Sequence, residues 1–176
     1  MGALDVRQNI IAETNYIDDY GSCCETFSTL RIYHEEDPPS EVTKILGVQP
    51  HDQQTKGVTK PNRRRPAKIN GWFFSSEGKV DSLDCRRHID WLMYPLIDKR
   101  EAFQNLLSRG YEIYISCFWV SRSGTGGPTL SPRQMKVLVD LGIEVSWDIY
   151  FASDSYSAEP PDPVEQVGDA KTDPPS

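Results

Sequence analysis

The sequence predicts an α+β fold, a two-layer sandwich with about four strands in the order β-α-β-α-β-α-β and helices on one face. Two runs carry this prediction: "YEIYISCFW" (111–119) and "IEVSWDIYF" (143–151) place apolar residues at every second position. A parallel sheet with helices on both faces has strands that are apolar all round. Because these two runs keep one polar face, we expect the second face of the sheet to be open, at least in part.

The first half of the chain predicts a strand and a short helix. Residues 26–33, "TFSTLRIY", alternate and are rich in β-branched and aromatic residues, which is typical of a strand. Asp37 is placed to cap a helix whose first position is Pro38. Gly47 is expected to end that helix in the left-handed conformation, and a long loop follows. The segment before Thr26 fits a short helix or an extra strand.

The middle of the chain predicts a second strand and a longer helix. Residues 71–76, "GWFFSS", form the strand. Ser82 is expected to open a helix that Pro95 kinks, because proline removes a backbone donor and clashes with the preceding turn. Asp98 is then expected to restart the helix through a capping box, and Gly110 to end it.

A glycine-rich segment, "SRSGTGGPTLSPRQM" (121–135), lies between a predicted strand and the last predicted helix. It is not a P-loop, since no lysine follows Gly127 directly, and Thr129 stands where the dinucleotide fingerprint needs glycine. Ser131 and Gln134 instead match a helix capping box. We expect a structural turn; the alternative is an anion held by backbone amides of Gly126, Gly127 and the helix start.

Charge and composition divide the chain into three parts. We expect an N-terminal extension over 1–25, a single α+β domain over 26–152 and a disordered tail over 153–176. The formal net charge is -7, and the tail contributes most of it with six acids against one lysine. The tail is also rich in proline and poor in large apolar residues.

The long loop carries a run of cations with no acid between Asp52 and Glu77. Such a run is a candidate surface for phosphate groups or an acidic partner. The alternative is a solvated, mobile loop that docks on the protein's own acidic tail. The cations are Lys56, Lys60, Arg63, Arg64, Arg65 and Lys68.

The open sheet face is the second candidate surface. Its polar faces combine acids, hydroxyls and aromatic rings, which suits a small cationic ligand or a basic protein partner. The alternatives are a plain solvated sheet, or cover by the N-terminal segment. The residues are Glu112, Tyr114, Ser116 and Phe118 beside Glu144, Ser146, Asp148 and Tyr150.

Several function classes are excluded or lack support. No run of 18 apolar residues is present, which excludes a membrane helix, and the N-terminal residues lack the pattern of a secretory signal, so we expect a cytosolic protein. The four cysteines and three histidines show no metal-ligand spacing, so neither a metal nor a cofactor is predicted. No nucleophile and base can be paired, and His88 is interpreted as a surface or helix-packing histidine.

Taken in order, several short motifs resemble one family, the bacterial domains of unknown function numbered 4279. The resemblance covers residues 27–151 and implies a cytosolic bacterial protein with the α+β layout described above. It carries over no catalytic residue. The motifs are "GW" at Gly71 and Trp72, "HIDWL" (88–92), "SCFW" (116–119), "GGPTLSP" (126–132) and "DIY" (148–150), after the helix ending at Gly47.

These observations predict a non-enzymatic binding module that engages a protein partner, such as a basic protein, through the acidic sheet face. The alternative is an anion or nucleic-acid binder that combines the basic loop with the glycine-rich turn; a membrane partner is not expected. The candidate binding residues are Lys56, Arg63, Arg64, Arg65, Trp72, Tyr114, Gly126, Gly127, Ser131, Asp148 and Tyr150.

Overall fold

The computed structural model describes residues 14–61 and 63–152, which form five strands and four helices. The strands are β1 (Cys23–His34), β2 (Asp52–Gln54), β3 (Asn70–Ser75), β4 (Glu112–Ser121) and β5 (Glu144–Phe151). The helices are α2 (Pro39–Leu46), α3 (Cys85–Met93), α4 (Arg100–Ser108) and α5 (Pro132–Leu141). None of these helices is long and apolar enough to cross a membrane. The predicted acidic tail lies outside the described residues.

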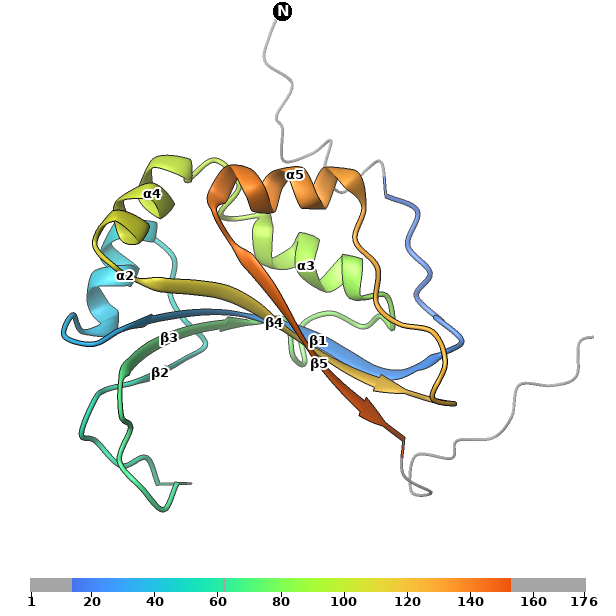
Figure 1. The fold of residues 1–176 in the computed structure, drawn as a ribbon, viewed down its shortest axis with the longest axis horizontal. Coiled ribbons are helices and arrows are strands. Elements are labelled where there is room, and N and C mark those ends of the chain that lie inside the picture. The colour runs from blue at the N-terminus through green and yellow to red at the C-terminus, as the bar shows by residue number, and fades with distance from the viewer. Residues whose placement is uncertain (1–13, 62, 153–176) are drawn as a thin grey trace, which may run out of the picture.

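One mixed sheet contains all five strands in the order β2-β3-β1-β4-β5. The central strand β1 pairs antiparallel with β3 and β4, whereas β4 and β5 are parallel. A parallel pair needs a crossover, and α5 provides it. Figure 1 shows the helices together on one face of the sheet. The predicted α+β class is therefore confirmed, and no helix of the described residues lies on the opposite face.

The core lies between the helices and the sheet, and alternation along the strands selects the side chains that enter it. In β1, Leu30 and Ile32 face the helices and are at most 1% exposed. Truncating a leucine buried to this degree to alanine costs about 2–5 kcal/mol. The helices contribute one apolar face each, including Leu46, Leu92, Leu106 and Leu138.

Two predicted helix ends are confirmed. Gly47 has φ 65° and its N–H donates to the carbonyl of Thr43 at 2.8 Å, which ends α2 in the left-handed conformation. Ser131 caps α5: its hydroxyl accepts from the Gln134 N–H at 3.2 Å, and the Gln134 side chain accepts from the Ser131 N–H at 3.0 Å. The capping box therefore explains the serine and glutamine after the glycine-rich turn.

The predicted count of four strands and the predicted element order are wrong, because β2 lies inside the predicted long loop. Its three residues pair antiparallel with Gly71 to Phe73 at the edge of β3. A three-residue strand is too short to show alternation, so the free edge of β3 decides its conformation rather than its own sequence. The observed order is β-α-β-β-α-α-β-α-β.

The predicted cap of the first helix is also wrong. Pro38 occupies the N-cap position of α2 and no side chain caps it. Asp37 instead accepts hydrogen bonds from Arg109 at 2.6 Å and from the Tyr111 hydroxyl at 2.8 Å. The sequence pattern predicted that the Asp37 carboxylate caps the helix, but it binds instead to residues of the turn before β4.

The long helix predicted from Ser82 is two helices. α3 begins after Asp84, whose carboxylate accepts from the Arg86 N–H at 3.0 Å, so the cap lies two residues later than predicted. The chain leaves the helix after Met93, and Pro95 lies in the turn that follows. Lys99 rather than Asp98 is the N-cap of α4, without a capping side-chain hydrogen bond.

Candidate functional site

A cleft of about 910 Å³ lies between the helix-free face of the sheet and the loop that joins β2 to β3. Figure 1 shows this loop on the side of the sheet opposite the helices. A volume of this size is typical of small-molecule sites. We call it the arginine cleft; its lining is Phe27, Thr29, Arg31, Tyr33, Asp52, Gln54, residues 63–69, Phe73, Ser75 and Glu77.

The loop is braced by hydrogen bonds near its base. The Gly57 N–H donates to the Ala67 carbonyl at 2.8 Å, and the Ala67 N–H donates to the Val58 carbonyl at 3.0 Å. The Gln54 side chain donates to the carbonyl of Ile69 at 3.0 Å. Because these hydrogen bonds join the two arms of the loop, they fix the base from which residues 63–65 extend.

Positive charge dominates the lining of the cleft. Its five cations are Arg31, Arg63, Arg64, Arg65 and Lys68, against the acids Asp52 and Glu77. Asp52 is already paired with Lys60, whose Nζ lies 2.5 Å from Oδ1 and 2.6 Å from Oδ2. The three loop arginines are exposed, and none forms an ion pair with another residue in the described part of the chain.

Arg31 brings a further cation to the floor of the cleft. Its guanidinium carbon lies 5.8 Å from the centre of the Phe73 ring, and Nη1 donates weakly to the Tyr33 hydroxyl at 3.4 Å. Its Nε is buried and has no hydrogen-bond partner among the described residues. A buried donor of a charged group that makes no hydrogen bond costs free energy. The same guanidinium lines the cleft, where its charge can attract an anionic ligand.

A row of small hydroxyl residues crosses the open face at the level of Thr29. The strand register places Ser75 of β3 beside Thr29 of β1, Thr29 beside Ser116 of β4, and Ser116 beside Ser146 of β5. Thr29 and Ser75 share a hydrogen bond of 2.9 Å between their hydroxyl oxygens. The end of this row at Ser75 and Thr29 forms part of the floor of the cleft.

Aromatic rings flank the hydroxyl row on one side. Phe27 stacks on Phe118 with ring centres 4.8 Å apart and an angle of 19°, and Phe118 meets Tyr150 at 5.2 Å. On the other side Tyr33 stacks on Tyr114 at 6.0 Å. Burial and the neighbouring Tyr33 raise the pKa of Tyr114 to about 12, so it stays a neutral hydroxyl at physiological pH.

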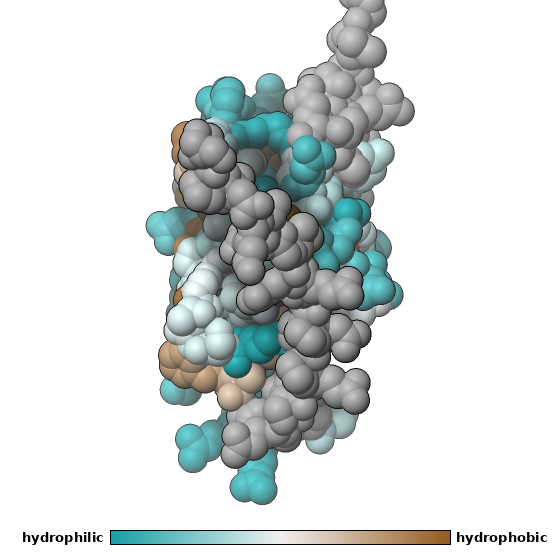
Figure 2. All heavy atoms as spheres, turned by 90° about the vertical axis from the view of Figure 1, so that its right-hand side faces the viewer, coloured by the Kyte–Doolittle hydropathy of each residue, from teal (hydrophilic) through white to brown (hydrophobic). Residues whose placement is uncertain are grey.

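The β4–β5 half of the open face has the opposite character. Glu112 and Glu144 are exposed, and the carboxylate of Asp148 accepts from the Ser116 hydroxyl at 2.8 Å. At the end of β5 two apolar side chains of the opposite face of the strand are exposed as well: Ile149 is 52% exposed and Phe151 is 72% exposed. Figure 2 looks onto this end of the molecule and shows apolar surface beside hydrophilic patches. The open face therefore carries opposite charge at its two ends.

Trp72 and Lys56 are among the predicted site residues that lie away from both surfaces. Trp72 is 0% exposed, and its Nε1 donates to the Thr43 hydroxyl at 3.1 Å, so it belongs to the core under α2. Lys56 lies outside the cleft, where its Nζ pairs with Glu35 at 2.8 Å. Of the other predicted residues, Arg63, Arg64 and Arg65 line the cleft, and Tyr114, Asp148 and Tyr150 lie on the acidic half.

The glycine-rich turn does not join the basic loop. Gly126, Gly127 and Ser131 lie between the end of β4 and the start of α5, and none of them lines the arginine cleft. The turn packs locally: the Tyr20 hydroxyl donates to the Gly127 carbonyl at 3.3 Å, and a Cβ at Gly126 would collide with the Ser22 side chain. The structural interpretation of these glycines therefore agrees with the packing.

Sequence reasoning missed the half of the cleft that β1 and β3 supply. The sequence predicted both strands but not their part in the cleft. On β1 the lining residues Phe27, Arg31 and Tyr33 share one face, and on β3 the lining residues include Phe73. The available signal was the polar Arg31 among apolar neighbours in "TFSTLRIY". That residue indicates that one face of β1 is open to a polar environment.

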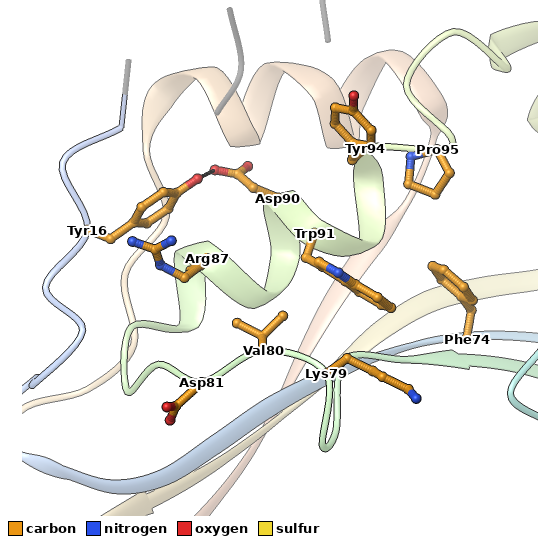
Figure 3. A pocket seen from close by; sticks show the side chains of 10 residues that line it. All are labelled: Tyr16, Phe74, Lys79, Val80, Asp81, Arg87, Asp90, Trp91, Tyr94 and Pro95. Carbon is orange, nitrogen blue, oxygen red and sulfur yellow. Dashed lines mark hydrogen bonds between the residues drawn. The ribbon is translucent and has the colours of Figure 1, made fainter. Parts of the chain in front are cut away.

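A second concavity of about 620 Å³ lies beside α3. Figure 3 shows Trp91 and Phe74 on its wall and the Tyr16 hydroxyl pointing at Asp90. Asp90 is 3% exposed and accepts from Tyr16 at 2.7 Å and from Gln134 at 3.0 Å. Burial raises the pKa of its carboxyl. Because Asp90 is satisfied by its neighbours, this concavity offers mainly apolar walls and is the weaker candidate.

A serine and histidine meet inside the core rather than in a cleft. His88 Nδ1 lies 2.8 Å from the Ser76 hydroxyl, and Nε2 donates to the carbonyl of Ser82 at 2.8 Å. Ser76 is 0% exposed and His88 is 1% exposed, so neither can meet a substrate in this structure. Across residues 14–61 and 63–152, no cluster of three acid, histidine or cysteine side chains could hold a metal ion.

The fold and the cleft define a small α+β domain with a one-sided sheet and a ligand-sized, positively charged cleft on its helix-free face. The chain belongs to the family described as "Domain of unknown function (DUF4279)", whose model matches residues 24–152. The family resemblance seen in the short motifs is therefore confirmed. Neither a curated protein nor a solved structure matches the chain significantly.

Proposed function

We propose that this chain is a non-enzymatic binding module that holds a phosphate-bearing ligand in the arginine cleft. The observation that supports the proposal is the meeting of Arg63, Arg64 and Arg65 with Arg31 around one volume. Asp52 is neutralised by Lys60, so Glu77 is the remaining acid of the lining. Anion binding through the basic loop thus takes precedence over the acidic sheet face, which the sequence favoured.

Phosphate fits this arrangement for chemical reasons. Guanidinium groups present a planar fork of N–H donors that matches two oxygens of a phosphate or carboxylate. Exposed arginines of like charge repel one another, and a multivalent anion relieves that repulsion. The hydroxyls of Thr29 and Ser75 on the floor can donate to further ligand oxygens.

The test is a calorimetric titration with inorganic tripolyphosphate at low salt. The variant Arg63→Gln, Arg64→Gln, Arg65→Gln is expected to bind at least about tenfold more weakly, since a hydrogen bond to a charged group contributes about 1.5–3 kcal/mol. The matched control Lys44→Gln, Arg100→Gln, Lys136→Gln removes three cations from the helix side. It should retain the affinity of the unchanged protein.

Two results would contradict the proposal. Equal losses in the two triple variants would mean that only net charge matters. No measurable binding of tripolyphosphate by the unchanged protein would remove the proposal altogether.

A second candidate function is recognition of a basic protein through the β4–β5 half of the open face. The exposed side chains of Glu144, Asp148 and Tyr150 on one face of β5 favour it, because a lysine-rich segment is complementary to that charge. Titration with a synthetic oligolysine peptide tests it. The variant Tyr114→Ala, Asp148→Ala, Tyr150→Ala should lose the peptide while tripolyphosphate binding persists. Unchanged peptide affinity would refute this candidate.

A further inference from the structure

A row of three aromatic rings leads across the open face into the arginine cleft. Tyr150, Phe118 and Phe27 follow one another from β5 through β4 to β1 with ring-centre spacings of 5.2 and 4.8 Å. Phe118 is stacked on Phe27 with an angle of 19° between the rings and is tilted by 36° against Tyr150. Phe27 is the last ring, and it lines the cleft.

The position after Phe27 in this row is not filled by the sheet. β3 pairs with β1 as far as Ser75 opposite Thr29 and then ends, so no β3 side chain stands beside Phe27. The chain turns away through Ser76, whose N–H donates to the Ser28 carbonyl at 2.9 Å. The next residue, Glu77, lines the cleft. A planar group entering the cleft can therefore continue the stack on Phe27.

The surroundings of that position are polar on two sides. The Thr29 and Ser75 hydroxyls form the adjacent floor, and the Glu77 carboxylate offers an acceptor for amino groups. The arginines at 63–65 lie on the loop wall of the same cleft. A ligand that uses all of these groups has a planar ring with hydrogen-bond donors, hydroxyls and a phosphate.

We infer that the ligand of the arginine cleft is a nucleotide, free or as one unit of a single strand. Its base stacks on Phe27 and its phosphate contacts the loop arginines. This inference rests on the proposed function and adds the chemical class of the ligand. Base stacking on aromatic side chains is tolerant of base identity, so it predicts affinity for several bases rather than a sequence code.

The other end of the same ring row supplies a matched control. Tyr150 is 53% exposed and, like Phe27, has Phe118 as its only neighbour in the row. Unlike Phe27, it shares its face of the strand with two acids, Asp148 and Glu144. Phosphate is repelled there. Replacing the ring at either end removes one aromatic group from the same row, and only Phe27 lies in the cleft.

The experiment measures fluorescence anisotropy of a labelled single-stranded octanucleotide, with adenosine monophosphate and tripolyphosphate as competitors. Phe27→Leu is expected to weaken the oligonucleotide about 5- to 100-fold and to leave tripolyphosphate affinity unchanged. Tyr150→Leu should change neither affinity. Phe27→Trp should retain or strengthen the oligonucleotide, which guards against a Phe27→Leu variant that loses its fold.

The outcomes separate this inference from the function on which it rests. If tripolyphosphate binds through the arginines but Phe27→Leu and Tyr150→Leu leave the oligonucleotide equally unaffected, the nucleotide inference is wrong and anion binding stands. If neither the octanucleotide nor adenosine monophosphate binds more tightly than tripolyphosphate, the inference is likewise overturned. If adenosine monophosphate competes at concentrations similar to those of the oligonucleotide, the ligand is a free nucleotide. If the oligonucleotide binds and adenosine monophosphate does not compete, the ligand is a single strand. Both results support a nucleotide as the chemical class of the ligand.

Discussion

The guanidinium of Arg31 lies 5.8 Å from the centre of the Phe73 ring on the neighbouring strand, and no carboxylate pairs with it within the described residues. The aromatic face offsets part of the cost of holding a cation there. The rest of this free-energy cost lowers the stability of the folded protein, at a position in the middle of the open face. This relationship links the stability of the sheet to the charge of the cleft.

Replacing Arg31 with methionine is therefore expected to separate stability from binding. The unsatisfied buried Nε disappears while the apolar stem is kept, so the melting temperature should stay equal or rise. Tripolyphosphate affinity should fall about tenfold, because one charged contact is lost. Thermal melting with and without tripolyphosphate measures both effects. A large loss of stability with unchanged affinity would show that Arg31 is structural.

The buried His88 should make the fold sensitive to mild acid. Burial is the main cause that lowers the pKa of His88 below its ordinary value of 6.5. The unfolded chain takes up a proton as the pH falls through about 6.5, and the folded chain takes it up only at a lower pH, so the free energy of unfolding decreases there. The loss reaches at most about 1.4 kcal/mol at pH 5.5.

Urea unfolding at pH 7.5 and pH 5.5 measures this loss. His51, whose pKa is also lowered by burial, acts in the same direction. The comparison with His88→Gln isolates the contribution of His88, because the glutamine does not titrate. An equal pH dependence in the unchanged protein and in His88→Gln would refute the assignment.

The glycine-rich turn should matter for stability and not for binding. Ser131→Ala is expected to destabilise the protein by about 1 kcal/mol, since the capping box of α5 is lost. Gly127→Asp meets open space and does not require a positive φ, so it should fold normally and bind tripolyphosphate with little change. A strong loss of anion binding in Gly127→Asp would instead place the ligand at this turn.

Deleting residues 153–176 is expected to strengthen anion binding at low salt. The segment carries six acids and one lysine, so its removal takes away much of the net negative charge that repels an anion. The gain should disappear at high ionic strength, because screening shortens the range of the interaction. Titrations at 20 and 300 mM salt, in the range where the Debye length changes most, provide the measurement. A gain that persists at high salt would contradict a purely electrostatic effect.

Much of the fold could be predicted from local patterns. Alternation identified β1, β4 and β5, and the polar faces of the last two strands correctly indicated helices on one side of the sheet. The failures arose where distant contacts decide the structure. β2 exists because β3 offers a partner edge, and Asp37 is drawn from its helix by Arg109 and Tyr111. No local pattern contains that information.

The candidate site shows the same division. The arginines at 63–65 were evident as a basic run, but their position against Arg31 and Phe27 depends on the register of β1 with β3, which pairs Thr29 with Ser75 across 46 positions of sequence. Composition suggested two separate surfaces, one acidic and one basic. The fold places the basic loop over one half of the sheet face and leaves the acidic residues on the other.

The most direct test of the central claim is an amide chemical-shift titration of the isotope-labelled protein with tripolyphosphate. The account predicts the largest shifts in the loop at 63–68 and at Thr29 and Arg31 of β1, with little change elsewhere. Shifts concentrated at 124–131 would place the anion at the glycine-rich turn, and shifts concentrated at 144–150 would place it on the acidic half. Either of these results would contradict the arginine cleft as the binding site.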